Sequence, residues 1–136
     1  MNIQETFNDS YDRCLQHKDF FSVFLHTFQQ QEGDIAQKFA HLDAKRLQGM
    51  LKGAIYMIML SINSVDARTK LHQYGKKHGP NGVNVTPEDY DTWLDCLLFS
   101  VKVCDPLYDE QIEQAWRTCF QFGIDIMKEE SHPQAS

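Results

Sequence analysis

Histidine 78 is the side chain of this sequence whose type and position best suit a metal ligand. Leu71, Tyr74 and His78 are spaced i, i+3 and i+7, so a helix would carry all three on one face. The sequence GPNG at residues 79–82 prevents such a helix from continuing. A neutral imidazole is a common metal ligand, but a histidine at a helix C-terminus is also stabilised by the helix dipole. For His78 taken alone, both interpretations stay open.

Other motifs that would indicate a specific chemistry do not occur in the sequence. It contains no HExxH zinc motif, EF-hand loop, Walker loop or GxSxG nucleophile motif. Its cysteines show neither a CxxC pair nor the spacing of a zinc site; they are Cys14, Cys96, Cys104 and Cys119. Free and mostly buried thiols are typical of a reducing compartment, so we expect a cytoplasmic protein.

Length and composition indicate one globular domain. The 136 residues, 42% of them hydrophobic, are enough to bury a substantial core. We expect a single domain over residues 1–136, with a core at about 3–128 and a tail at 129–136. The formal net charge of -6 disfavours nucleic-acid binding. No apolar run approaches the ~20 residues of a membrane-spanning helix, and the polar N-terminus does not resemble a signal peptide.

Apolar spacing predicts helices almost throughout and strands nowhere, so the expected fold class is all-α. The predicted helices span residues 3–16, 20–28, 34–39, 43–62, 67–78, 87–101 and 109–127. Asp19, Asp43 and Thr86 are expected to cap the helices that follow them. We expect the last two helices to be antiparallel because their connection is short.

The helix at 43–62 has the clearest amphipathic pattern, with apolar residues recurring from Leu47 to Ile62. Tyr56, Met57 and Leu60 widen its apolar surface, so we expect burial on more than one side. Aromatic residues make up 12% of the chain. They suit either a tightly packed core or a cavity for a large flat apolar guest.

Five segments, in this order, resemble a bacterial single-domain globin over residues 20–128. They are Phe39, LQGMLKGAIYMIML (47–60), YGKKH (74–78), GVNVTPEDYDTWLDCLL (82–98) and EQAWRTCFQFGIDIM (113–127). The resemblance implies a globin fold of six to eight helices. It also implies haem b, held between the helix at 43–62 and the helix at 67–78.

The same resemblance assigns roles to individual residues. His78 matches the proximal histidine that binds the iron, Phe39 the phenylalanine that wedges the porphyrin, and Tyr74 a residue packed under the ring. Further matches concern the walls of the haem pocket: Met50 on the gas-binding side, Val83 and Val85 in the loop, and Trp93, Leu94 and Leu97 at the far edge.

The sequence departs from the globin pattern on the gas-binding side. Seven residues after Phe39, where a distal His or Gln is common, stands Arg46, which would contact either the gas or a haem propionate. Gln48 and His41 are the other candidate donors. The tyrosine that bacterial globins often carry on the second helix is replaced by Leu25 or Phe24, and a tyrosine of the last helix by Phe120.

The resemblance implies reversible binding of a diatomic gas (O2, NO or CO) at pentacoordinate iron, for oxygen binding or NO handling. Catalysis is not expected, because NO dioxygenase-type activity would require a separate reductase as partner and the sequence has no nicotinamide or flavin motif. The alternative is a gas-sensing or haem-free globin-like signalling domain. The sequence does not indicate the physiological gas or the oligomeric state.

Overall fold

A computed structural model describes residues 2–31, 35–40, 42–78 and 85–131, without the side chains at 35, 36, 78, 130 and 131. Within these residues the chain forms helices and no strand, as expected for an all-α fold. The helices are α1 (Ile3–Gln16), α2 (Phe20–Gln29), α3 (Ile35–Lys38), α4 (Ala44–Ser61), α5 (Val65–His78), α6 (Pro87–Cys104) and α7 (Glu110–Ser131). Each helix of this described part is too short or too polar to cross a lipid bilayer.

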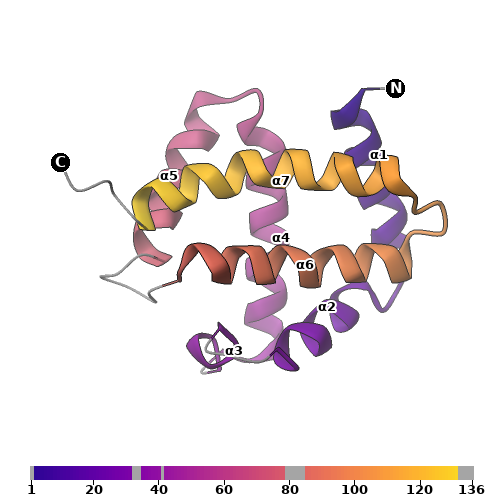
Figure 1. The fold of residues 1–136 in the computed structure, drawn as a ribbon, viewed down its shortest axis with the longest axis horizontal. Helices are drawn as coiled ribbons and strands as arrows, with labels where there is room; N and C mark the ends of the chain where they lie inside the picture. The colour runs from indigo at the N-terminus through magenta and orange to yellow at the C-terminus, as the bar shows by residue number, and fades with distance from the viewer. Residues whose placement is uncertain (1, 32–34, 41, 79–84, 132–136) are drawn as a thin grey trace.

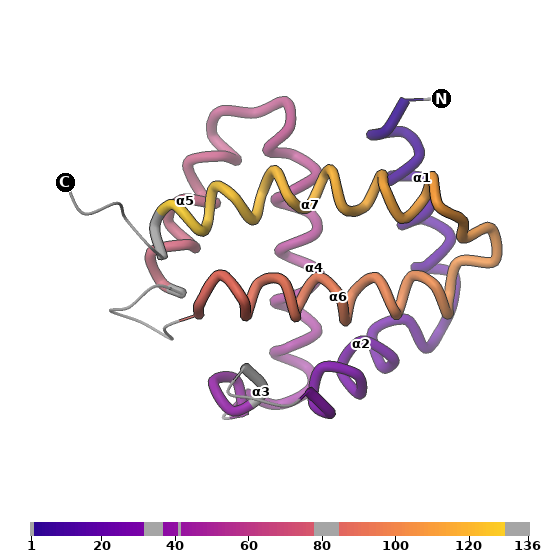
Figure 2. Tube along the Cα trace, in the orientation of Figure 1, coloured from indigo at the N-terminus to yellow at the C-terminus, as the bar shows by residue number. Residues whose placement is uncertain are grey.

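Helices α6 and α7 lie side by side and run in opposite directions, as their short connection predicts (Figure 1). Helix α4 crosses behind both of them, from α3 at its start to α5 at its end (Figure 2). Helix α1 packs on α7 and α2 packs on α6, both toward the end of the pair where α6 is connected to α7. The crossed arrangement leaves α4, α5, α6 and α7 around a common space at one end of the molecule.

Helix starts follow the capping pattern of the sequence with one exception. The Asp43 carboxylate accepts a hydrogen bond from the Arg46 amide at 2.8 Å. Thr86 and Asp89 form a reciprocal capping box, with hydrogen bonds of 3.0 and 3.2 Å. Asp19 precedes α2, but its side chain makes no capping hydrogen bond within the described part of the chain. Its backbone (φ -101°, ψ 4°) is not the extended form that places a side-chain oxygen over the first turn.

Helix α4 is buried on one side only, in part against expectation. Leu51, Ile58 and Met57 are buried, whereas Tyr56 is 61% exposed and Leu60 is 41% exposed. The prediction of a wider buried surface was therefore right for Met57 and wrong for Tyr56 and Leu60. The helices that pack on α4 leave the side of these two residues uncovered.

A polar cluster, the Asp105 cluster, fixes the end of the molecule where α1 meets the α6–α7 connection. The fully buried Asp105 carboxylate accepts hydrogen bonds from Ser10 Oγ (2.6 Å), Arg13 Nε (2.7 Å) and the Leu107 amide (2.9 Å). Ser10 in turn accepts a hydrogen bond from Trp116 Nε1 at 2.9 Å. Burial alone would raise the pKa of Asp105, but the hydrogen bonds from Arg13, Ser10 and Leu107 lower it.

All four cysteines are buried free thiols, as the sequence predicts. Burial raises the pKa of Cys14 to about 12, and the pKa values of Cys96 and Cys119 to about 11. Thiols with raised pKa values carry little thiolate, which is the reactive form. These residues therefore act as small core side chains rather than as nucleophiles.

Candidate functional site

The space between α4, α5, α6 and α7 contains an apolar cavity of about 290 Å³. This volume is close to the lower end of the range for ligand pockets. Residues from every one of these helices, together with Phe39 after α3 and Val85 before α6, form its walls. The lining residues are Phe39, Gly49, Met50, Gly53, Ala54, Ile58, Leu71, Tyr74, Val85, Asp89, Tyr90, Trp93, Ile124 and Met127.

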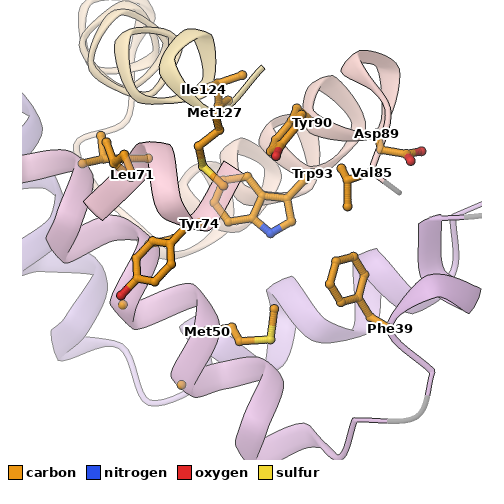
Figure 3. A pocket seen from close by; sticks show the side chains of 14 residues that line it. Phe39, Met50, Leu71, Tyr74, Val85, Asp89, Tyr90, Trp93, Ile124 and Met127 are labelled. Carbon is orange, nitrogen blue, oxygen red and sulfur yellow. The ribbon is translucent and has the colours of Figure 1, made fainter. Parts of the chain in front are cut away.

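Aromatic side chains surround the cavity from several helices. Figure 3 shows the indole of Trp93 in the middle of the group, with Tyr74 on one side, Phe39 on the other and Met50 facing them from α4. Trp93 also contacts Phe120 at 5.6 Å and Phe24 at 5.8 Å between ring centroids. Trp93 therefore contacts core aromatic residues and also lines the cavity.

The cavity wall contributed by α4 is partly bare backbone. Gly49 and Gly53 stand one turn apart on this wall. Apart from the adjacent residues and the nearby backbone of α4, no described atom lies within 4 Å of the point where a Cβ would be. Between them Met50 is 40% exposed, and across the cavity Tyr74 is 38% exposed. Apolar surface that the chain itself leaves uncovered is typical of a binding site.

One ion pair stands at the edge of this apolar cavity. Lys38 Nζ pairs with the Asp89 carboxylate, which lines the cavity and also belongs to the capping box with Thr86. Burial would raise the pKa of Asp89, but the hydrogen bonds and charge of Lys38 and the hydrogen bonds of Thr86 lower it. Because Phe39 directly follows Lys38, the pair also joins the segment that carries Phe39 to the start of α6.

A crystal structure of a protein from Pseudomonas aeruginosa, described as structurally highly homologous to a human hemoglobin, is similar to this chain along nearly its whole length. The sequences are 30% identical, the match covers 96% of this chain and 98% of the other, and the TM-score is 0.90. The chain belongs to the bacterial globin-like proteins. No protein-family model matches the sequence, and no curated protein is significantly similar to it.

Haem is the prosthetic group that a globin fold implies, and the cavity of this globin suits such a group. At Gly49 and Gly53 the α4 wall has no side chain that would limit the approach of a guest. The rings of Phe39 and Tyr74 and the indole of Trp93 offer apolar contacts to a planar guest (Figure 3). The residues present therefore fit a flat, largely apolar group.

The structure brings together five of the residues that the sequence assigns to a haem pocket. Phe39, Met50, Tyr74, Val85 and Trp93 all line the cavity of this globin. They come from distant segments of the chain, and only tertiary packing makes them neighbours: α4 contacts α5, and α7 packs on α4, α5 and α6.

The remaining assigned residues lie elsewhere or outside the described part. Leu94 and Leu97 are buried in the core, and the cavity wall formed by described residues does not include them. Arg46 is exposed in the first turn of α4 and likewise does not belong to this wall. Val83 lies outside the described residues, as does the candidate donor His41. Gln48 is half-buried and is not part of the described cavity wall.

His78 is the last residue of α5, and its side chain lies outside the described part. On the same helix, Leu71 lies about two turns before it and Tyr74 about one turn before it, and both line the cavity.

Several cavity residues have no place in the sequence-based assignment. Gly49, Gly53 and Asp89 are the most informative of them. The sequence did contain a signal for the two glycines, which stand four residues apart inside a long predicted helix. Glycine disfavours helices, so its presence at both positions indicates a local structural reason. For Asp89 the sequence indicated only a role at the start of a helix. It did not indicate the ion pair with Lys38, because the two residues are 51 positions apart.

Proposed function

We propose that this globin binds haem b in the cavity between α4 and α5, with His78 as the residue that ligates the iron. When bound, haem supplies an iron atom with an open coordination position for O2, NO or CO. The role we propose is oxygen binding or NO handling. NO dioxygenase-type activity would require a separate reductase as partner.

The observation that carries the proposal is the register of α5 against the cavity. Leu71 and Tyr74 both line the cavity, and residue 78 follows them by seven and four positions on the same helix. Residues spaced i, i+3 and i+7 share one helix face, so helical geometry supports His78 as the ligand. A neutral imidazole is a suitable ligand for haem iron.

The α4 side of the cavity determines what surrounds the bound gas. Among the described residues, α4 contributes to the cavity wall only backbone and apolar side chains, namely Gly49, Met50, Gly53, Ala54 and Ile58. Bound O2 draws negative charge outward, and a hydrogen bond to a charged group is worth about 1.5–3 kcal/mol. Without such a donor from α4, we propose faster O2 release than in globins with a distal tyrosine or histidine. CO is less sensitive to a missing donor because it carries less charge.

Haem titration tests the assignment directly. Haem added to the purified chain should bind at one equivalent and give the absorbance bands of a histidine-ligated iron. His78→Ala should lose haem or bind it weakly, and added imidazole should restore the bands. His26→Ala, on the exposed surface of α2, is the matched control and should bind haem like the wild type.

Two results would contradict the proposal. Failure of the wild type to take up haem would favour the haem-free signalling alternative. A wild-type spectrum for His78→Ala without added imidazole would exclude His78 as the ligand. The roles of Arg46 and Gln48 are tested separately by stopped-flow measurement of O2 release. If either side chain reaches the gas, its leucine variant releases O2 faster. If Arg46 instead contacts a haem propionate, Arg46→Leu mainly weakens haem retention.

A further inference from the structure

The long helices around the cavity and the Phe39 wall, defined as residues 37–40, differ in how they are held in place. In the described part of the chain, α4 packs on α5 and α7, and α7 packs on α5 and α6. Helix α3, which ends one residue before Phe39, has four residues, and an isolated helix of this length is not stable by itself. The position of Phe39 therefore depends on tertiary contacts of the residues around it.

Two of the contacts that hold the Phe39 wall come from distant helices. The Phe39 ring packs against Phe28 of α2, with 6.0 Å between the ring centroids. Lys38 Nζ pairs with the Asp89 carboxylate near the start of α6, and the two side chains are only 18% and 14% exposed. The ion pair joins residues 51 positions apart, so it connects the Phe39 wall to α6 across the edge of the cavity.

Asp89 is itself fixed in position by the start of α6. Its Oδ2 accepts a hydrogen bond from the Thr86 amide at 3.0 Å, and its own amide donates to Thr86 Oγ1 at 3.2 Å. The same Oδ2 accepts the hydrogen bond from Lys38 Nζ, and hydrogen bonds between charged groups are stronger than those between neutral groups. Figure 3 shows Phe39, Val85 and Asp89 on one side of the cavity, which all three residues line.

We propose that Lys38 and Asp89 are positioning residues of the haem site, whose ion pair holds Phe39 in the cavity wall and sets the rate at which haem leaves. The inference rests on the proposed haem function and adds a means of regulating it. A porphyrin that leaves the cavity must displace part of the surrounding wall. Among the walls that the described residues form, the Phe39 wall follows a helix of a single turn, and local opening requires least free energy where few packed contacts hold a segment.

Direct contact with a haem propionate is an alternative role for Lys38, and the two roles predict opposite effects of a change at Asp89. If the ion pair holds Phe39, Asp89→Asn removes the charged partner of Lys38, and haem leaves faster. If Lys38 binds a propionate, Asp89→Asn removes a competitor for the ammonium group, and haem leaves more slowly.

The experiment measures the rate of haem transfer to apomyoglobin from wild type, Asp89→Asn, Lys38→Met and the double variant. Asparagine keeps an oxygen for the Thr86 amide and methionine keeps most of the apolar stem of lysine, so each substitution removes mainly a charge. Lys38→Arg is the conservative variant that keeps the charge. Asp91→Asn is the matched control, because the Asp91 carboxylate is on the same helix but is 62% exposed where it pairs with Lys128.

The expected result is faster haem loss in both single variants. Loss of one partly buried ion pair should speed haem loss about fivefold in Asp89→Asn and in Lys38→Met. The double variant should lose haem no faster than the single variants, because both substitutions act through the same contact. Lys38→Arg and Asp91→Asn should stay within about twofold of the wild-type rate.

Trypsin provides a second measurement, which uses the ligand-free chain. Cleavage of the bond between Lys38 and Phe39 requires local opening of this segment. Asp89→Asn should therefore be cut at this bond about fivefold faster than wild type, in proportion to the lost ion pair. Cleavage after Lys52, which lies inside α4, is the internal reference and should keep its wild-type rate.

Two results would overturn the inference. Haem loss from Asp89→Asn at or below the wild-type rate would show that the ion pair does not retain haem, and a slower rate would assign Lys38 to a propionate. Unchanged cleavage after Lys38 in the same variant would show that the ion pair does not hold the Phe39 wall. Failure of the wild type to take up haem is a different outcome, which rejects the proposed function, while the trypsin measurement still decides whether the ion pair holds Phe39.

Discussion

The two ends of this globin differ in how completely the chain itself satisfies its buried and apolar groups. At one end, the buried Asp105 carboxylate is satisfied entirely from within the chain, by Ser10, Arg13 and the Leu107 amide. At the other end, α4 and α5 present apolar surface to a cavity of about 290 Å³, with Met50 and Tyr74 still 40% and 38% exposed. The chain itself supplies hydrogen-bond partners at the first end, whereas it leaves apolar surface uncovered at the second.

The difference indicates which residues should contribute most to the stability of the ligand-free chain. A buried charge that keeps all its partners fixes the surrounding elements, because losing one partner leaves the others buried and unpaired. A cavity wall contributes less, since its side chains lack contacts on one side. We therefore expect substitutions at the Asp105 cluster to act on folding, and substitutions at the cavity to act mainly on binding.

The largest effect is expected at the Asp105 cluster. Asp105→Ala removes the acceptor of Arg13 and Ser10, and breaking a buried ion pair costs about 3–5 kcal/mol. Urea denaturation of ligand-free protein measures the loss. Asp95→Ala is the control, because its carboxylate is 68% exposed and lies 3.5 Å from Arg117, a geometry worth about 1 kcal/mol or less. Equal losses in the two variants would contradict the importance of the cluster.

Two neighbours on α4 sharpen the comparison further. Leu51 is 2% exposed in the core, whereas Met50 is 40% exposed at the cavity. Leu51→Ala should destabilise the ligand-free chain by about 2–5 kcal/mol, and Met50→Ala by clearly less. For haem retention we expect the opposite order, with a larger loss in Met50→Ala than in Leu51→Ala. The rate of haem transfer to apomyoglobin measures this loss. Equal destabilisation of the ligand-free chain by both would mean that the cavity closes over Met50.

A smaller loss is expected where α7 crosses α4. Gly123→Ala places a methyl group 2.5 Å from Cγ1 of Ile58, and overpacking of this kind costs about 1–3 kcal/mol. Thermal melts should therefore shift down for Gly123→Ala. Combining it with Ile58→Ala should cost less than the sum of the two single losses, because the new methyl group then fills the space left by Ile58. Additive losses would show that Ile58 is not the residue in conflict.

The smallest effect concerns pH and the ion pair at the edge of the cavity. The pKa of Asp89 is lowered, so its contribution to stability is present above about pH 4, the ordinary pKa of an aspartate, and is lost as the pH falls through the lowered value. Asp89→Asn should therefore cost about 1 kcal/mol at neutral pH and progressively less in acid.

Denaturation curves between neutral pH and pH 3 test this expectation. Asp91→Asn is the control on the same helix, because its carboxylate is 62% exposed where it pairs with Lys128. A difference between wild type and Asp89→Asn that stays constant across this range would contradict the role of the ion pair.

The sequence by itself determined the helices and indicated several residues that line the cavity. Apolar spacing along the chain, with the caps at Asp43 and Thr86, depends on contacts within three or four residues, so it can be read without the fold. The same local geometry placed Leu71, Tyr74 and residue 78 on one face of α5. The resemblance to globins then supplied Phe39, Met50, Val85 and Trp93, all of which line the cavity.

Only the tertiary structure decided which apolar and small residues face a neighbour and which face open space. Tyr56 and Met57 both widen the apolar surface of this helix in the sequence, yet one is 61% exposed and the other 8%. Gly123 and Gly53 are both helical glycines, yet a Cβ on the first would meet Ile58 and a Cβ on the second would meet nothing described within 4 Å. Such differences depend on helices far apart in sequence, such as the 51 residues between Lys38 and Asp89, and helical periodicity carries no information about them.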